Sequence, residues 1–239
     1  MNNKSKYIGV EARVQYKILE GAIFNYLSDS SLDNIGLHSH VRQYTKGENR
    51  AKKVLKHING LIHRNQEILK QLMRNFDGES FAQLSNPDRK ALALSLFCLS
   101  FPITYDILIG FAQAFKVQEI VSKEVIIRKI GSAYGSNRAM HIAVTELIPL
   151  LIEIGVIKRM KIGIYSKGST LVISNKIVAE LVIYTDIKLS GSKSILFEEL
   201  SFKPWFSYFD ISVVSTSDFG RLLVKKDSVI GKGYITLKG

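Results

Sequence analysis

The chain is poor in cysteine, and Cys98 is the only one among 239 residues. A single cysteine excludes a disulfide within one chain and any zinc site built from cysteine ligands. Cys98 lies in an apolar run. A chain without a disulfide fits the reducing cytoplasm. The first residues, MNNKSKY, contain no apolar core of a signal peptide. We therefore expect a cytoplasmic protein.

The sequence also lacks the motifs of the common catalytic classes. GxSxG, HExxH, GxxxxGK[ST], and GxGxxG after a strand do not occur. The acidic residues are scattered singly apart from Glu198 and Glu199, whereas a metal-dependent nuclease needs clustered carboxylates. Asp218–Gly220 spell DFG by chance, because no kinase catalytic loop precedes them. We predict no enzymatic activity and no cofactor, and a nuclease core in the C-terminal strands stays an open alternative.

A metal site is not predicted either. His38 and His40 form an H-x-H pair, but no Cys, Asp or Glu clusters with them.

Long hydrophobic runs are scarce, and the longest apolar stretch covers residues 91–115. Pro102, Asp106 and Gln113 interrupt it, with Thr104 and Tyr105 nearby. A transmembrane span is the alternative that its length raises. We predict two buried helices joined near Phe101 and Pro102, and no membrane association.

Positive charge is abundant, with a net charge of +12. Residues 38–74 hold nine Lys or Arg against two Glu, and residues 118–176 hold nine against four acidic residues. These two segments account for the whole excess. Clustered positive charge favours a polyanionic partner over a generally soluble surface.

Helical periodicity dominates the first third of the chain. Apolar residues recur at helix spacing over residues 9–27 and, most clearly, over 49–76, while 35–44 is either a short helix or a loop. The opposite face of the 49–76 helix carries Lys53, Lys56, His57, Arg64, Lys70 and Arg74. This face is typical of a solvated bundle helix, and contact with phosphates is the second hypothesis.

Three shorter helices, residues 88–99, 103–115 and 123–133, lead into a helix that begins at Ser136. Gly155 ends this helix, although Pro149 inside it is expected to bend or split it. Two β-rich runs follow, which we expect Ser166-Lys167-Gly168 to separate. A helix followed by a hairpin is the end of a winged helix-turn-helix, whose helix enters the major groove of DNA.

The predicted DNA-binding residues lie on this helix, on the hairpin and on two preceding helices. Asn137, Arg138, His141 and Thr145 share one side of the helix and are expected to enter the groove. Phosphate contacts are assigned to Arg128, Lys129, Lys158, Arg159, Lys161 and Lys167, with Lys53, Lys56 and Arg64 as further candidates. The structural alternative is that Asn137 only caps the helix and His141 is an ordinary surface histidine.

The C-terminal quarter changes in character. A helix over 175–187, capped by Ser174 or Asn175, precedes a Ser/Gly loop over 189–193. Residues 195–209 are rich in aromatic side chains, which we expect to close a small core rather than to stack on bases. The runs DISVV, RLLV, SVI and YITL predict a short β meander that pairs with the wing strands.

The predicted fold is mainly α with a small β part. Residues 1–84 would form an N-terminal helical bundle, 85–187 a winged-helix-like domain, and 188–239 an aromatic and β-rich extension.

Four segments also carry a resemblance to a known family. They are VEAR at 10–13, GENRAKKVLKHINGLI at 47–62, DRKALALSLFCLSFPITYDILIGF at 88–111 and ELIPLLIEIGVIKR at 146–159. In pattern and order, over residues 8–187, the chain resembles the BrxA family of BREX phage-defence systems. The resemblance implies a small, mostly helical, non-enzymatic DNA-binding protein that works beside a methyltransferase and large ATPases.

We therefore expect a DNA-binding accessory protein of a phage-defence system, with double-stranded DNA and other defence proteins as partners. Two alternatives stay open. One is a protein-interaction adaptor whose positive charge meets an acidic partner, and the other is a winged-helix transcription regulator with a preferred operator.

Overall fold

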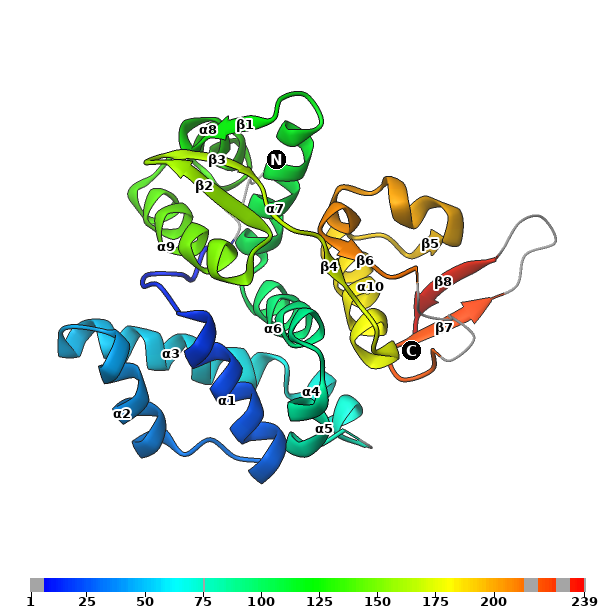
Figure 1. The fold of residues 1–239 in the computed structure, drawn as a ribbon, viewed down its shortest axis with the longest axis horizontal. Helices are drawn as coiled ribbons and strands as arrows, with labels where there is room; N and C mark the ends of the chain where they lie inside the picture. The colour runs from blue at the N-terminus through cyan, green and yellow to red at the C-terminus, as the bar shows by residue number, and fades with distance from the viewer. Residues whose placement is uncertain (1–6, 75, 213–218, 227–232, 239) are drawn as a thin grey trace.

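A computed structural model describes residues 7–74, 76–212, 219–226 and 233–238. The chain is mainly helical with small sheets, as the sequence predicts (Figure 1). The helices are α1 (Tyr16–Asp29), α2 (Asn34–Tyr44), α3 (Glu48–Arg64), α4 (Gln66–Met73), α5 (Gly78–Gln83), α6 (Asn86–Ser100), α7 (Pro102–Phe115), α8 (Lys123–Tyr134), α9 (Arg138–Ile154) and α10 (Lys176–Ser190).

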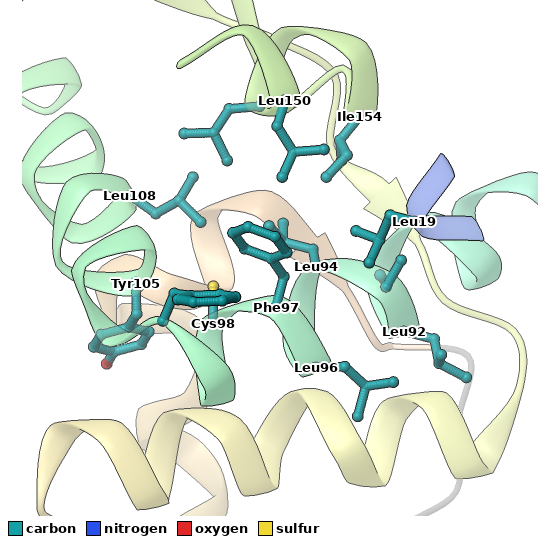
Figure 2. Packing of buried hydrophobic residues seen from close by; sticks show 14 of the residues in the cluster. Leu19, Leu92, Leu94, Leu96, Phe97, Cys98, Tyr105, Leu108, Leu150 and Ile154 are labelled. Carbon is teal, nitrogen blue, oxygen red and sulfur yellow. The ribbon is translucent and has the colours of Figure 1, made fainter. Parts of the chain in front are cut away.

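Helix α6 lies at the centre of the molecule and packs against α1, α3, α7 and α10 (Figure 1). Ser85 caps it, and Pro87 in its first turn needs no hydrogen-bonding partner for its nitrogen. Figure 2 shows Leu92, Leu94, Leu96, Phe97 and Cys98 of α6 among Leu19 of α1, Tyr105 and Leu108 of α7, and Leu150 and Ile154 of α9. One continuous core therefore joins the N-terminal helices to the rest, and the domain boundaries stay predictions.

The N-terminal segment differs from its prediction in its starting point. Residues 9–15 are not helical, and α1 begins at Tyr16. The Tyr16 amide donates to the carboxylate of Glu153 on α9, at 2.7 Å. A side chain distant in the sequence therefore accepts one of the amides that have no partner within the first turn of the helix. The stretch 35–44 is a helix, whose N-cap is Asp33.

The predicted helix over residues 49–76 is wrong as a single element, because the chain breaks at Asn65. The buried Asn65 amide donates to the carbonyls of Leu61 and Leu96 and to the hydroxyl of Ser100. The bonds to Leu96 and Ser100 of α6 fix the residue in a non-helical conformation (φ −98°, ψ 10°) between α3 and α4.

The apolar stretch 91–115 forms two helices that meet at Phe101 and Pro102, as predicted. Among the described residues, no single helix has the length and apolar character to cross a bilayer; α6 and α7 together do, but a bend of 116° separates them.

The winged-helix part is built from α7, β1 (Ile120–Ser122), α8, α9, β2 (Ile157–Lys161) and β3 (Ile164–Lys167), in that order. The three strands form an antiparallel sheet in the order β1-β3-β2. This is the connectivity of a winged helix-turn-helix, and it agrees with the predicted fold. Helix α9 runs unbroken past Pro149, so the predicted split does not occur.

The wing hairpin turns at Ile162 and Gly163, not at Ser166-Lys167-Gly168 as predicted. Gly163 has a φ of 74°, which favours glycine at this turn. Gly168 instead packs against the backbone after α9, where an added Cβ would lie 2.0 Å from the Gly155 carbonyl oxygen. Lys167 is therefore the last residue of β3 and lies at the base of the wing.

The C-terminal part packs on the other side of α6 through α10 (Figure 1). Asn175 caps α10, as predicted, but the helix continues to Ser190. Strand β4 (Leu171–Val172) precedes α10 and pairs in parallel with β6 (Phe209–Asp210), which follows it. The other strands after α10 are β5 (Ser194–Leu196), β7 (Leu223–Lys226) and β8 (Tyr234–Leu237), in the sheet order β5-β8-β7.

The aromatic segment forms two 3-10 turns, η1 (Phe197–Phe202) and η2 (Pro204–Tyr208). Trp205 and Tyr208 are fully buried and donate hydrogen bonds to the carbonyls of Val182 and Leu108. The prediction of a small aromatic core is thereby confirmed. The prediction that the meander pairs with the wing is wrong for RLLV and YITL, which pair with each other. SVI and the end of DISVV lie outside the described residues.

Candidate nucleic-acid interface

The exposed strip at the start of α9 is the centre of the candidate interface. Asn137, Arg138, His141 and Thr145 are all exposed, while Met140, Ala143, Val144, Leu147 and most of the later apolar residues of the helix are buried. The alternation arises because side chains at spacings of three and four share a face. The structure thus brings together the four residues that the sequence placed in the groove.

Two of these four residues have a role in the helix itself. The Asn137 side-chain oxygen accepts the Met140 amide at 3.0 Å, which is an N-cap. The Thr145 hydroxyl donates to the His141 carbonyl at 2.9 Å. The side chains of Arg138 and His141 have no hydrogen bond or ion pair within the described ranges. These two residues are therefore the ones free to meet base edges.

The adjacent edge of α9 carries two carboxylates that bind the N-terminal part of the chain. Glu146 accepts hydrogen bonds from Arg50 of α3 at 2.9 and 3.1 Å. Glu153 pairs with Arg13 and accepts the Tyr16 amide. Both acidic groups are thereby compensated, so neither of them offsets the positive charge of the exposed strip.

The wing presents three exposed cations on β2, namely Lys158, Arg159 and Lys161. Lys158 lies opposite Ser166 and Arg159 opposite Tyr165, and a register shift then places Lys161 opposite Ile164. Alternate residues of a strand face opposite sides, so Lys158 and Lys161 share one face of the sheet and Arg159 the other. None of the three has an ion pair within the part of the chain that the structure describes.

The other predicted phosphate contacts are more dispersed. Lys167 is exposed at the base of the wing, opposite Ile157. Arg128 and Lys129 are exposed on α8. The aliphatic chain of Lys129 lies against α7, where a Cβ added at Gly110 would be 3.6 Å from the Cδ of Lys129.

Helix α3 meets the start of α9 across a hollow of about 430 Å³. Its lining is Ile8, Gly9, Val10, Glu11, Lys53, Arg138, Ala139 and Ile142. Lys53 lies 3.5 Å from Glu11, which partly compensates its charge, whereas Lys56 is exposed. The structure thus places Lys53 and Arg138 on the same hollow, an arrangement that no local sequence pattern reveals.

Arg64, at the far end of α3, is engaged in the fold. It donates to the Ser100 carbonyl at 2.8 Å and to the Tyr7 hydroxyl at 2.7 Å, and it stacks on the rings of Tyr7 and Phe101. These contacts assign Arg64 to holding the N-terminal segment, and we leave it outside the interface.

His57 does not belong to the charged face where the sequence placed it. It is buried, its Nε2 accepts the Glu11 amide at 3.1 Å, and its ring packs edge-on against Phe101. The pKa of His57 is lowered to about 4, mainly because burial disfavours the charged form, and nearby cations lower it further. His57 is therefore a neutral acceptor that fixes the segment bearing Glu11.

The two histidines of the H-x-H pair have separate contacts. His38 lies 3.2 Å from Glu48, and His40 packs edge-on against Tyr44. Within the described residues, no three His, Cys, Asp or Glu side chains form a group that could hold a metal ion.

Sequence reasoning missed the residues that set the orientation of α9, above all Arg50 and Arg13. Their partners lie more than ninety positions away in the chain, so no local signal identified them.

Comparisons of the chain with protein-family models, curated proteins and solved structures gave no match.

Proposed function

We propose that this chain is a non-enzymatic DNA-binding protein that contacts duplex DNA mainly through the phosphate backbone. One observation carries the proposal. A winged-helix arrangement presents exposed cations on α9 and on the wing, and these cations have no acidic partner in the described residues. Lys and Arg that lack protein partners can replace the counterions of phosphates, which is the main source of affinity for DNA.

Each element has a separate role in this proposal. The start of α9 enters the major groove, where Arg138 and His141 reach base edges. Lys158, Arg159 and Lys161 on the wing, together with Arg128 on α8, contact phosphates and carry little sequence information. Lys53, which lines the same hollow as Arg138, and Lys56, exposed on the next turn of α3, add positive charge on the α3 side of this surface.

The resemblance to the BrxA family supplies the biological setting. We place the protein as an accessory component of a bacterial phage-defence system that acts on DNA beside other defence proteins. This setting rests on the order of sequence segments, whereas the DNA-binding role rests on the geometry of α9 and the wing.

Fluorescence anisotropy with a labelled random duplex tests the proposal, with unlabelled duplex, single-stranded DNA and RNA as competitors. We expect Kd of about 10⁻⁶ M or tighter at low salt, with unlabelled duplex as the best competitor. No binding at low salt would contradict the proposal and favour the adaptor. Strong preference for one operator in a sequence selection would favour the transcription regulator instead.

The matched control replaces three exposed lysines elsewhere. Lys188, Lys193 and Lys225 lie on or after α10 and on β7, and changing all three to alanine removes the same charge as changing Lys158, Arg159 and Lys161. Only the wing variant should weaken binding strongly. Equal losses would mean that net charge, rather than this surface, determines affinity.

A further inference from the structure

The tip of the wing carries an isoleucine that contacts almost nothing in the chain. Ile162 is 94 % exposed, the highest value among the large apolar residues of the described chain, and Met160 beside it is 53 % exposed. The turn itself does not require isoleucine, because Gly163 supplies the positive φ and the preceding turn position, which has a negative φ, accepts most residues. A polar residue would serve the turn equally well and cost less in water.

The tip is also held firmly in place. The β2–β3 ladder continues up to Lys161 and Ile164, on either side of the turn. The Gly163 carbonyl accepts the Lys123 amide at the start of α8, at 2.8 Å. An exposed apolar side chain on an anchored turn is therefore projected in a fixed direction away from the domain.

Cations flank this apolar tip on both faces of the hairpin. Residues 157–167 contain four Lys or Arg and no Asp or Glu. The register shift places Lys161 with Lys158 on one face and leaves Arg159 on the other. Positive charge on both faces suits a tip that lies between two phosphate strands.

We propose that Ile162 is a wedge that enters the minor groove of bound DNA and partly unstacks a base step. Proteins that insert an apolar side chain there combine it with Arg or Lys contacts and kink the duplex by at least about 20°. The minor groove is only about 6 Å wide, so a narrow hairpin tip fits where a helix does not. This inference rests on the proposed function and adds a deformation of the DNA to it.

The test uses the full chain and two readouts that charge alone does not produce. A duplex labelled at both ends reports bending by energy transfer, and 2-aminopurine within the duplex reports unstacking by increased fluorescence. We expect the wild type to raise both signals. Ile162→Ala should abolish both and weaken binding roughly tenfold, while Val117→Ala, another highly exposed residue outside the hairpin, should change neither.

Ile162→Lys separates the wedge from electrostatics. It should retain binding through the added charge but lose the bending and the unstacking. Binding by the wild type without a bend, or bending by Ile162→Ala equal to that of the wild type, would overturn the wedge and leave the proposed function intact. Absence of any duplex binding by the wild type would overturn both.

Discussion

Arg50 on α3 donates hydrogen bonds to both carboxylate oxygens of Glu146 on α9, at 2.9 and 3.1 Å. The pair joins the N-terminal helices to the helix that we assign to the major groove. Glu146 is one turn beyond Ile142, on the edge of α9 next to the exposed strip. Arg50 therefore both fixes the position of α9 and compensates a negative charge close to the proposed DNA.

Arg50→Ala should weaken duplex binding at low salt by about two- to fivefold, because it uncovers the charge of Glu146 near the phosphates. Adding Glu146→Gln should restore most of the affinity, which a double-mutant cycle measures. A double variant that binds no better than Arg50→Ala would place Glu146 away from the DNA.

Arg138→Ala and Lys158→Ala should differ in their effects on sequence choice. Arg138 lies where base edges are read, so its loss should relax the preference at one or two positions, at a cost of about 1–3 kcal/mol. Lys158 should contact phosphate, so its loss should weaken binding to all duplexes alike. Selection from a random duplex library with each variant measures the difference. Identical selected sequences for the wild type and Arg138→Ala would place Arg138 outside the groove.

His57 should make the stability of the protein depend on pH below neutrality. The folded state holds the pKa of His57 at about 4, below the value of 6.5 for a free histidine, because burial disfavours the charged form. Between these values the unfolded state binds more protons, so stability is fully present above pH 6.5 and is lost as pH falls toward 4. The loss from pH 7 to about pH 4.5 should be about 2–3 kcal/mol in urea unfolding.

His57→Gln should remove most of this pH dependence, while His63→Gln, which alters an exposed histidine of the same helix, should leave it as in the wild type. An unchanged slope in His57→Gln would show that another group titrates.

Glu180 should anchor the C-terminal sheet independently of DNA binding. One oxygen of this buried carboxylate accepts the amides of Gly220, Arg221, Leu222 and Leu223. Glu180→Ala should destabilise the protein by about 3–5 kcal/mol, since it leaves buried donors unpaired. Hydrogen exchange at residues 220–223 should rise sharply. Glu199→Gln, an exposed control on η1, should leave this exchange at the wild-type rate; an unchanged rate in Glu180→Ala would contradict the anchoring role.

The elements that sequence reasoning predicted well have local causes. The break between α6 and α7 follows from Pro102, and the start of α10 follows from the Asn175 cap. The strip of α9 follows from helical periodicity, and the aromatic core follows from the density of large apolar side chains. Each of these signals lies within a few residues of the feature it predicts.

The features that sequence reasoning missed depend on distant partners. Glu153 determines where α1 begins, and the bonds of Asn65 to α6 break a helix whose apolar stripe continues without interruption. His57 matches the polar face by spacing, but the segment around Glu11 covers it. The position of the wing turn was missed because Ile162 and Gly163 look less typical of a turn than Ser166-Lys167-Gly168.

The salt dependence of duplex binding tests the central claim most directly. The logarithm of the affinity should fall linearly with the logarithm of salt concentration, by roughly 0.9 for each phosphate neutralised. Replacing Lys158, Arg159 and Lys161 together should therefore reduce the slope by roughly 2 to 3, whereas replacing Lys188, Lys193 and Lys225 should leave it unchanged. A wing variant with the wild-type slope, or wild-type binding that does not respond to salt, would contradict the account.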